Sequence, residues 1–230
     1  MTTRIAVLAS GGGSNLQAIL DHFDALGDQR SGRVVVVGSD RATAGALERA
    51  RRCDIPAVVL GSEPVAAKAS LERLLEEHRV EIIALSGYLK LVPPDVVARF
   101  EGRIVNVHPA LLPAFGGHGM YGTRVHHAVI ASGARVSGVT VHHVDAQYDH
   151  GGIIAQWPVP VFPSDDAGML ADRVLRVEHL LYPRVLDALA GGRLSPARRD
   201  DAPAGTKPAF TLLPHEDSRL AENIELALAR

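Results

Sequence analysis

The chain contains one cysteine, Cys53, among 230 residues, so no disulfide can form within it. Structural disulfides belong to oxidising compartments, and a chain without one favours a reducing setting. Long apolar runs are also missing: none approaches the roughly 20 residues that span a bilayer, and Ile5 to Ala9 is too short for a signal-peptide core. We therefore expect a cytoplasmic protein that does not use the membrane. Cys53 lies in a helical pattern rather than a basic loop, which predicts a buried, inert thiol.

An excess of either charge is absent as well. Lys and Arg number 24 and Asp and Glu number 26, which gives a formal net charge of -2. A nucleic-acid groove or an anionic membrane surface would call for a positive excess, so the composition argues against both and favours small-molecule partners. The length of 230 residues suggests one large domain with an appended segment. We expect the protein to be a monomer or a homodimer.

Apolar, β-rich runs alternate with helix-sized segments through the N-terminal half. This β-α-β-α order with strongly apolar strands predicts a parallel sheet that is wound right-handedly and covered by helices on both faces. The expected strands are Arg4–Ala9, Val34–Gly38, Ala57–Leu60, Glu81–Leu85 and Ile104–His108, and the expected helices are Leu16–Phe23, Ala42–Cys53 and Val65–His78.

The regular alternation of strand and helix patterns ends after residue 124. A helix near Val125–Ala131 precedes two longer alternating segments, Val136–Val144 and Ile153–Val161, which we expect to pair as added strands. A long helix should follow from about Ala167 to Leu189. The predicted fold class is α/β: a doubly wound, mostly parallel, Rossmann-like sheet with added strands in the C-terminal half and a long C-terminal helix.

The sequence predicts that the last part of the chain is a segment appended to the main domain. Gly191 to Lys207 has the composition of a linker, and beyond it Leu220, Ile224 and Leu228 recur every fourth residue, which indicates an amphipathic helix. We expect this helix to pack on its own domain or to fray, with a subunit contact as the alternative. The predicted division is a domain over residues 1–195 and a linker with an amphipathic tail over 196–230.

A glycine-rich turn, Ser10-Gly11-Gly12-Gly13-Ser14-Asn15, lies between the first strand and first helix. Its glycines let the backbone turn tightly, and Ser14 or Asn15 can cap a helix whose first N–H groups would face a phosphate. A dinucleotide fold is the competing interpretation, because Asp40 ends the second strand where a ribose-binding acid would stand. Leu16, however, occupies the position of that motif's third glycine.

Asn106, His108 and Asp149 have the composition of an acyl-transfer site. Residues two apart on a strand project to one face, so Asn106 and His108 should stand together, and Pro109 ends the strand there. The carboxyl edge of an open α/β sheet is where ligands bind. A carboxylate such as Asp149 beside the imidazole would raise its pKa and poise it as a general acid, while an amide N–H could hold a developing oxyanion.

Two other site types fit poorly. The pairs His126-His127 and His142-His143, with His150, suggest a metal, but adjacent strand residues point to opposite faces, and the chain lacks a Cys cluster and a His-Glu-x-x-His helix. No Gly-x-Ser-x-Gly turn follows a strand, which argues against a serine hydrolase.

Across roughly residues 4 to 195 the chain resembles the phosphoribosylglycinamide formyltransferases, within the folate-dependent formyltransferase superfamily. The Asn-x-His plus Asp signature is shared by that superfamily, and the N-terminal Gly-Gly-Ser-Asn loop favours this branch of it. The matching segments, in order, are Gly12–Asn15, Leu47–Ala50, Leu85–Tyr88, Asn106–Pro109, Leu111–Pro113, Asp149–Gly152, and Glu178-His179 before Tyr182-Pro183.

The resemblance implies transfer of the formyl group of 10-formyltetrahydrofolate, a cosubstrate, to the amine of glycinamide ribonucleotide in purine biosynthesis, without a metal. It implies that Asn106, His108 and Asp149 are catalytic. It also implies that Gly12, Gly13, Ser14 and Asn15 bind the substrate phosphate, that Glu178 binds the ribose hydroxyls, and that Leu85, Tyr88, Leu89, Lys90, Leu91 and Val92 form the folate pocket with Asn106 and Asp149. The long glycine-rich loop from Gly116 to Gly122 leaves Arg124 and His126 without an assignment.

Three alternatives stay open. A methionyl-tRNA formyltransferase would keep the three catalytic residues but should add a C-terminal domain and a basic surface. A formyltetrahydrofolate hydrolase would usually add an N-terminal regulatory domain, whereas this chain opens on the first strand. A non-catalytic nucleotide-binding module would explain the glycine-rich loop and Asp40 but would leave Asn106, His108 and Asp149 without a purpose.

Overall fold

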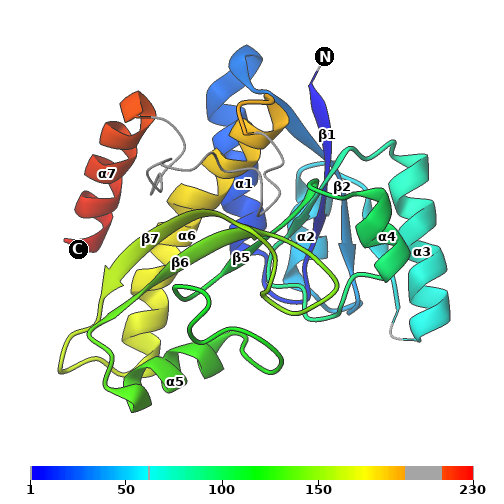
Figure 1. The fold of residues 1–230 in the computed structure, drawn as a ribbon. Helices are drawn as coiled ribbons and strands as arrows, with labels where there is room; N and C mark the ends of the chain where they lie inside the picture. Colours follow the sequence, from blue (N-terminus) through cyan, green and yellow to red (C-terminus); the bar gives the residue numbers. More distant parts are fainter. Residues whose placement is uncertain (1, 62, 195–213, 230) are drawn as a thin grey trace, which may run out of the picture.

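A computed structural model describes residues 2–61, 63–194 and 214–229, with side chains of the last segment from residue 221 onward. Its centre is a seven-stranded sheet in the order β3-β2-β1-β4-β5-β6-β7 (Figure 1). Because strand order doubles back at β1 and β4, the sheet is wound in two directions from its middle, as predicted. The strands are β1 Thr3–Leu8, β2 Gly32–Ser39, β3 Ala57–Val59, β4 Ile82–Leu85, β5 Ile104–His108, β6 Val136–His143 and β7 Ile153–Pro160.

Strands β1 to β5 pair in parallel, and β6 and β7 are added antiparallel to β5 and to each other. The two added strands confirm the prediction for the C-terminal half. In the register of β5 and β6, Asn106 lies opposite His142 and His108 lies opposite Thr140. This register brings β6 side chains beside the predicted catalytic strand.

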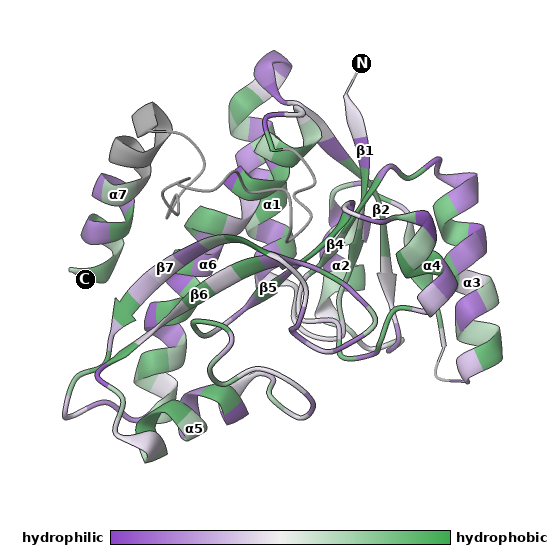
Figure 2. Ribbon diagram, viewed as in Figure 1, coloured by the Kyte–Doolittle hydropathy of each residue, from purple (hydrophilic) through white to green (hydrophobic). Residues whose placement is uncertain are grey.

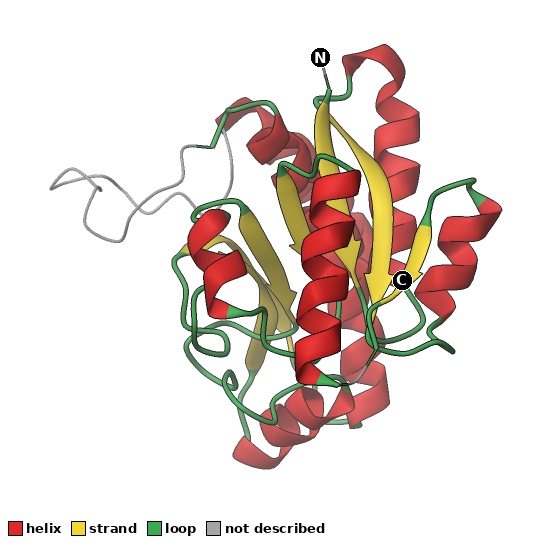
Figure 3. Cartoon of the chain, turned by 90° about the vertical axis from the view of Figure 1, so that its right-hand side faces the viewer, coloured by secondary structure: helices red, strands yellow, loops and turns green. Residues whose placement is uncertain are grey.

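Helices cover both faces of the sheet (Figure 3). Alternate residues of β1 divide between two hydrophobic clusters: Ile5 and Val7 pack with α1, α2 and α6, whereas Ala6 and Leu8 pack with α3 and α4. Successive strand side chains point to opposite faces, so this division is what a fully covered sheet requires. The helices are α1 Ser14–Leu26, η1 Gly27–Gln29, α2 Gly45–Arg52, α3 Pro64–Glu77, α4 Pro94–Arg99, α5 Thr123–Ser132, α6 Ala167–Ala190 and α7 Pro214–Leu228.

Hydropathy follows the same layers. Figure 2 shows hydrophobic residues along the central strands, and α3 carries hydrophobic and hydrophilic residues side by side. The apolar face of α3 presents Leu71, Leu74 and Leu75 to the sheet. Among the described helices, none is long and apolar enough to cross a membrane.

Two local predictions need correction. Helix α4 was not anticipated, because six residues beginning at Pro94 are too short to display a helical apolar period. Cys53 is exposed, so the prediction of a buried thiol is wrong. It is the residue directly after α2, where the helix ends.

Helix α7 packs on α6. Ile224 is fully buried in the main core, and Leu228 packs against the same cluster. Arg176 of α6 donates from Nη1 to the carbonyl oxygen of Ala227 at 3.1 Å, which satisfies one of the carbonyls at the end of α7. The prediction that this helix packs on its own domain is confirmed for these residues. The Leu220 side chain and most of the predicted Gly191–Lys207 linker lie outside the described residues.

Candidate active site

The predicted catalytic pair occupies the end of β5. His108 is buried, with 3% of its surface exposed, and Asn106 is half-buried. Pro109 follows immediately and directs the chain away from the sheet. The next residues are then tied to β6, because Thr140 donates from Oγ1 to the Ala110 carbonyl oxygen at 2.6 Å and accepts from the Leu112 N–H at 3.0 Å. These bonds fix where the chain leaves the strand.

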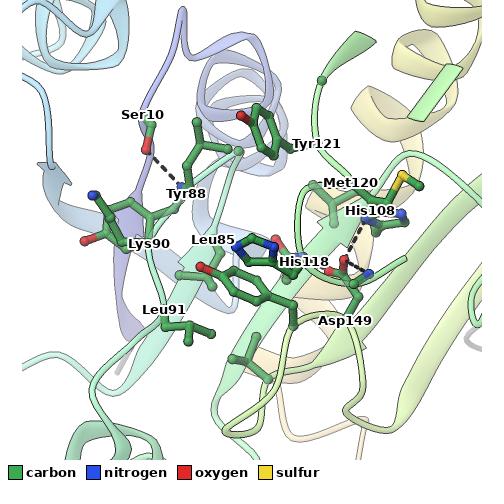
Figure 4. Close-up of a pocket in the computed structure, with 18 of the residues that line it drawn as sticks. Ser10, Leu85, Tyr88, Lys90, Leu91, His108, His118, Met120, Tyr121 and Asp149 are labelled. Carbon is green, nitrogen blue, oxygen red and sulfur yellow. Dashed lines mark hydrogen bonds and ion pairs between the residues drawn. The ribbon is translucent and has the colours of Figure 1, made fainter. Parts of the chain in front are cut away.

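Asp149 comes to this pair from the loop between β6 and β7. Its Oδ2 lies 3.5 Å from Nδ1 of His108 (Figure 4). Its Oδ1 lies 3.5 Å from Nδ2 of Asn106. The backbone N–H of Gly117 donates to the same Oδ2 at 2.9 Å. The predicted convergence of the three side chains is therefore confirmed, although Asn106 and Asp149 are 43 positions apart in the sequence.

The protonation of His108 differs from the prediction. Burial lowers the pKa of the imidazole, and this influence outweighs Asp149 and the Phe115 carbonyl, which raise it. The expectation of a raised pKa is wrong, because a nearly enclosed ring loses more hydration than one carboxylate restores. The ring nitrogen Nε2 lies 2.9 Å from the Phe115 carbonyl oxygen, which can only accept, so Nε2 carries the proton of the neutral ring. Nδ1 then faces Asp149 with its lone pair.

The Asp149 carboxyl is ionised at neutral pH. Burial alone raises its pKa, but the contacts with His142, His108 and the Gly117 N–H together lower it below the usual value. Its backbone φ is +54°, in the left-handed region that Asp adopts more readily than most residues. The surrounding contacts hold the residue in this conformation.

His142 belongs to the site and was not anticipated as a site residue. Its Nδ1 lies 2.7 Å from the His143 carbonyl oxygen and its Nε2 lies 3.1 Å from Nδ2 of Asn106. Since the carbonyl oxygen can only accept, Nδ1 donates, while Nε2 faces both the Asn106 amide and, at 3.7 Å, Oδ1 of Asp149. Sequence position could not reveal this contact, which depends on the register of β6 against β5.

The histidines do not form a metal centre in the described parts of the chain. His142 faces Asn106, while His143 is opposite Val105 in the register, so neighbouring strand residues divide between two faces as expected. No group of three or more potential metal-binding side chains occurs among the described residues.

A cavity of about 430 Å³ opens beside the predicted catalytic residues. Its size is typical of sites for small molecules, and its walls combine apolar side chains with a few polar groups. All six residues predicted for the folate pocket besides Asn106 and Asp149 line it, and so do the three predicted catalytic residues (Figure 4). They are Leu85, Tyr88, Leu89, Lys90, Leu91, Val92, Asn106, His108 and Asp149.

The glycine-rich turn reaches the cavity through its first residues. Ser10 and Gly11 line the cavity, and Ser10 accepts from the Leu89 N–H through Oγ at 3.0 Å. Gly13 is the residue at the start of α1, with φ +75° and no side-chain cap, so the expected capping by Ser14 or Asn15 is wrong. A Cβ at Gly13 would lie 2.7 Å from the Cα of Ala46, which explains why glycine is needed at this close approach.

The residues predicted to bind the substrate do not line the cavity, unlike Ser10 and Gly11 of the same turn. They are Gly12, Gly13, Ser14, Asn15 and Glu178. Asn15 donates from Nδ2 to Glu178 Oε2 at 2.6 Å, so the structure brings these two predicted residues together across α1 and α6. Burial raises the pKa of Glu178 to about 7, against the opposing effect of the Asn15 hydrogen bond. The buried Oδ1 of Asn15 has no hydrogen-bond partner among the described residues.

The sequence profile described as formyl transferase matches residues 3–186, which is most of the chain. The chain belongs to the formyl transferase family. It is 44% identical over 204 residues to the chloroplastic phosphoribosylglycinamide formyltransferase of Vigna unguiculata, covering 87% of this chain and 64% of that protein. The chain thus spans less than two thirds of that relative's length.

Solved structures of the same family share the fold. The glycinamide ribonucleotide transformylase 1 of Symbiobacterium toebii is 41% identical with a TM-score of 0.77, over 84% of this chain and 90% of that one. The transformylase 1 of Geobacillus kaustophilus is 39% identical with a TM-score of 0.75, and 83% of this chain covers all of it. That formyl transferase therefore leaves a part of this chain without a counterpart.

Proposed function

We propose that the protein transfers the formyl group of 10-formyltetrahydrofolate to the amine of glycinamide ribonucleotide, as a phosphoribosylglycinamide formyltransferase of purine biosynthesis. The observation that carries the proposal is the meeting of Asn106, His108 and Asp149 in a cavity that also contains Ser10 and Gly11 of the glycine-rich turn. One-carbon transfer between two small molecules needs an acyl-transfer centre and two adjoining binding regions. The names of the relatives support glycinamide ribonucleotide as the acceptor of the formyl group.

The cavity residues suit a formyl folate. Leu85, Leu91 and Val92 provide an apolar wall, and the backbone between Gly87 and Val92 provides polar groups for a heterocyclic ring. Lys90 lines the same region and would attract an anionic tail. The bound folate supplies the activated formyl group and leaves as tetrahydrofolate.

The glycine-rich turn and Glu178 would hold the ribonucleotide. The N–H groups at the start of α1 are suited to the phosphate, because the helix dipole favours negative charge there. Asn15 joins this turn to Glu178, which we assign to the ribose hydroxyls. We propose that residues 1–195 form the formyltransferase domain and that 196–230 are an appended segment.

Asn106, His108 and Asp149 would act on the formyl centre. Negative charge collects on the formyl oxygen when the amine attacks, and it raises the pKa of the adjacent His108 ring. The positive charge of the protonated ring and the Asn106 N–H can then stabilise that oxygen, and one such preorganised donor is typically worth about 3 kcal/mol. Asp149 stabilises the charged ring from Nδ1.

The second proposed role of His108 and Asp149 is to carry a proton. The amine loses one proton and the departing folate nitrogen gains one, so the site must accept a proton and return it. The Asp149 carboxylate and His108 Nδ1, 3.5 Å apart, are the pair that can carry it. We further propose a cytoplasmic monomer or homodimer that needs neither a metal nor a nucleic acid.

A coupled absorbance assay of the folate product tests the proposal. Product formation that requires glycinamide ribonucleotide supports the transferase. Formate release without the amine would instead support a formyltetrahydrofolate hydrolase. Formylation of a charged initiator tRNA would support a tRNA formyltransferase, and ribonucleotide binding with no turnover would support a binding module; each of these results contradicts the proposal.

A further inference from the structure

A pair of aromatic rings joins two loops over the cavity. The ring of His118, from the loop after β5, and the ring of Tyr148, from the loop between β6 and β7, have centroids 5.7 Å apart and planes inclined at 64°. Both residues line the cavity, and Figure 4 shows His118 among its lining side chains. Edge-to-face contact is favoured because the positive edge of one ring meets the negative face of the other.

The two rings adjoin the groups whose hydrogen bond holds the catalytic carboxylate. His118 follows Gly117, whose N–H donates to Asp149 Oδ2, and Tyr148 directly precedes Asp149. The loops approach closely here, since a Cβ at Gly116 would lie 3.2 Å from the Asp149 Cβ. The ring contact and this hydrogen bond therefore join the same two loops.

Asp149 depends on such support. Its φ of +54° lies in the left-handed region, which residues other than glycine adopt infrequently, so contacts around the residue help to keep it there. The ion pair within its own loop, between His150 Nδ1 and Asp145 Oδ2 at 2.8 Å, is 52% and 40% exposed. Exposed pairs contribute little to loop rigidity. The ring contact, in contrast, reaches across to the neighbouring loop.

We propose that His118 and Tyr148 are positioning residues whose ring contact holds the Asp149 loop against Gly117 and so places the carboxylate beside His108. The inference rests on the proposed formyl transfer and adds two residues that act through Asp149. It also assigns a role to His118, which lies in the glycine-rich segment from Gly116 to Gly122.

The test compares His118→Ala, Tyr148→Ala, the double variant and Tyr148→Phe in the full chain. Each alanine variant should lower kcat about tenfold, the loss of one aromatic contact, and the double variant should be no slower than the slower single variant. Tyr148→Phe keeps the ring and should restore most of kcat. In the alanine variants the acid limb of the kcat profile should move to higher pH, because the Gly117 N–H that helps to hold the Asp149 pKa low is displaced.

His127→Ala and Phe162→Ala are the controls, since both remove an exposed ring that does not line the cavity. Neither should change kcat. If the alanine variants raise the KM for formyl folate but leave kcat and its pH profile unchanged, the two rings only contribute to the binding surface of the cavity. That result would overturn the proposal. The unfolding free energies of the two single alanine variants and the double variant can be compared without any substrate. Additive losses of unfolding free energy would show that the two rings do not interact and would also overturn the proposal. Absence of transfer by the unaltered protein contradicts the proposed function instead.

Discussion

The carboxylate of Asp149 lies 3.5 Å from Nδ1 of a His108 ring whose other nitrogen is committed to the Phe115 carbonyl oxygen. Phe115 and Gly117 belong to one short segment, so the same stretch of backbone contacts both His108 and Asp149. The His108 ring is neutral at rest because burial lowers its pKa, and Asp149 stabilises the charged form as soon as it arises. With this arrangement, negative charge that develops beside His108 in the proposed reaction would raise the pKa of the ring and favour its protonation.

Asp149→Asn should lower kcat at least a hundredfold, since it removes the charge that stabilises protonated His108, and charged contacts of this kind are worth roughly 3 kcal/mol or more. Asn also tolerates the φ of +54°, so the fold should remain intact. Steady-state rates and thermal unfolding measure the two effects. Turnover near that of the parent would remove Asp149 from the mechanism.

His108→Ala should also lower kcat about a hundredfold or more, because it removes both the proton carrier and the positive charge that stabilises the formyl oxygen. His127→Ala, at an exposed position of α5, is the matched control and should keep full activity. Single-turnover rates separate the chemical step from product release. An undiminished chemical step in His108→Ala would exclude the proposed role.

His142→Phe should lower kcat about tenfold by releasing the Asn106 amide from the Nε2 atom that orients it, the loss of one hydrogen bond near the reacting centre. His143→Phe is the comparison, because that side chain belongs to the other face of β6. Rates measured at saturating substrates decide between them. Equal effects of the two substitutions would show that His142 is only a packing residue.

Gly13→Ala should reduce the unfolding free energy by at least about 2 kcal/mol, because it adds a left-handed alanine and a backbone overlap. The new Cβ would lie 2.7 Å from the Ala46 Cα, whereas a Cβ at Gly12 meets nothing within 4 Å. Gly12→Ala should therefore be nearly neutral in stability. Urea unfolding of the two variants checks the difference, and similar losses would contradict the close approach.

Glu178→Gln should weaken the pH dependence of stability. The pKa of Glu178 is raised to about 7 by burial, so its stabilising protonated form is fully present below the unfolded value of 4.5 and is lost as the pH rises through about 7. Gln cannot ionise and can still accept from Asn15. Between about pH 5 and pH 8 the parent should lose about 2 to 3 kcal/mol more than the variant.

Urea unfolding at the two pH values measures this difference. Glu101→Gln, at an exposed position, is the control and should behave like the parent. Identical pH dependence in Glu178→Gln and the parent would show that the Glu178 carboxyl does not titrate in this range.

Periodicity in the sequence was enough to predict most of the elements. Strand β5 was predicted with its observed bounds, and the alternating runs after residue 135 became β6 and β7. Helix α4 escaped because it is shorter than two helical turns. The capping of α1 was also misjudged, because Gly13 takes the position that a polar cap would fill and its left-handed φ is not visible in a residue pattern.

By itself, the sequence determined the layered α/β sheet, the pairing of Asn106 with His108 on one strand face, and a part of the cavity lining, because these follow from local spacing and from segments that resemble the family. Only the tertiary structure decided the protonation of His108, the contact of His142 with Asn106 and the reach of His118 to Tyr148. Burial and cross-strand register are sums over residues distant in the chain, and no local pattern contains them.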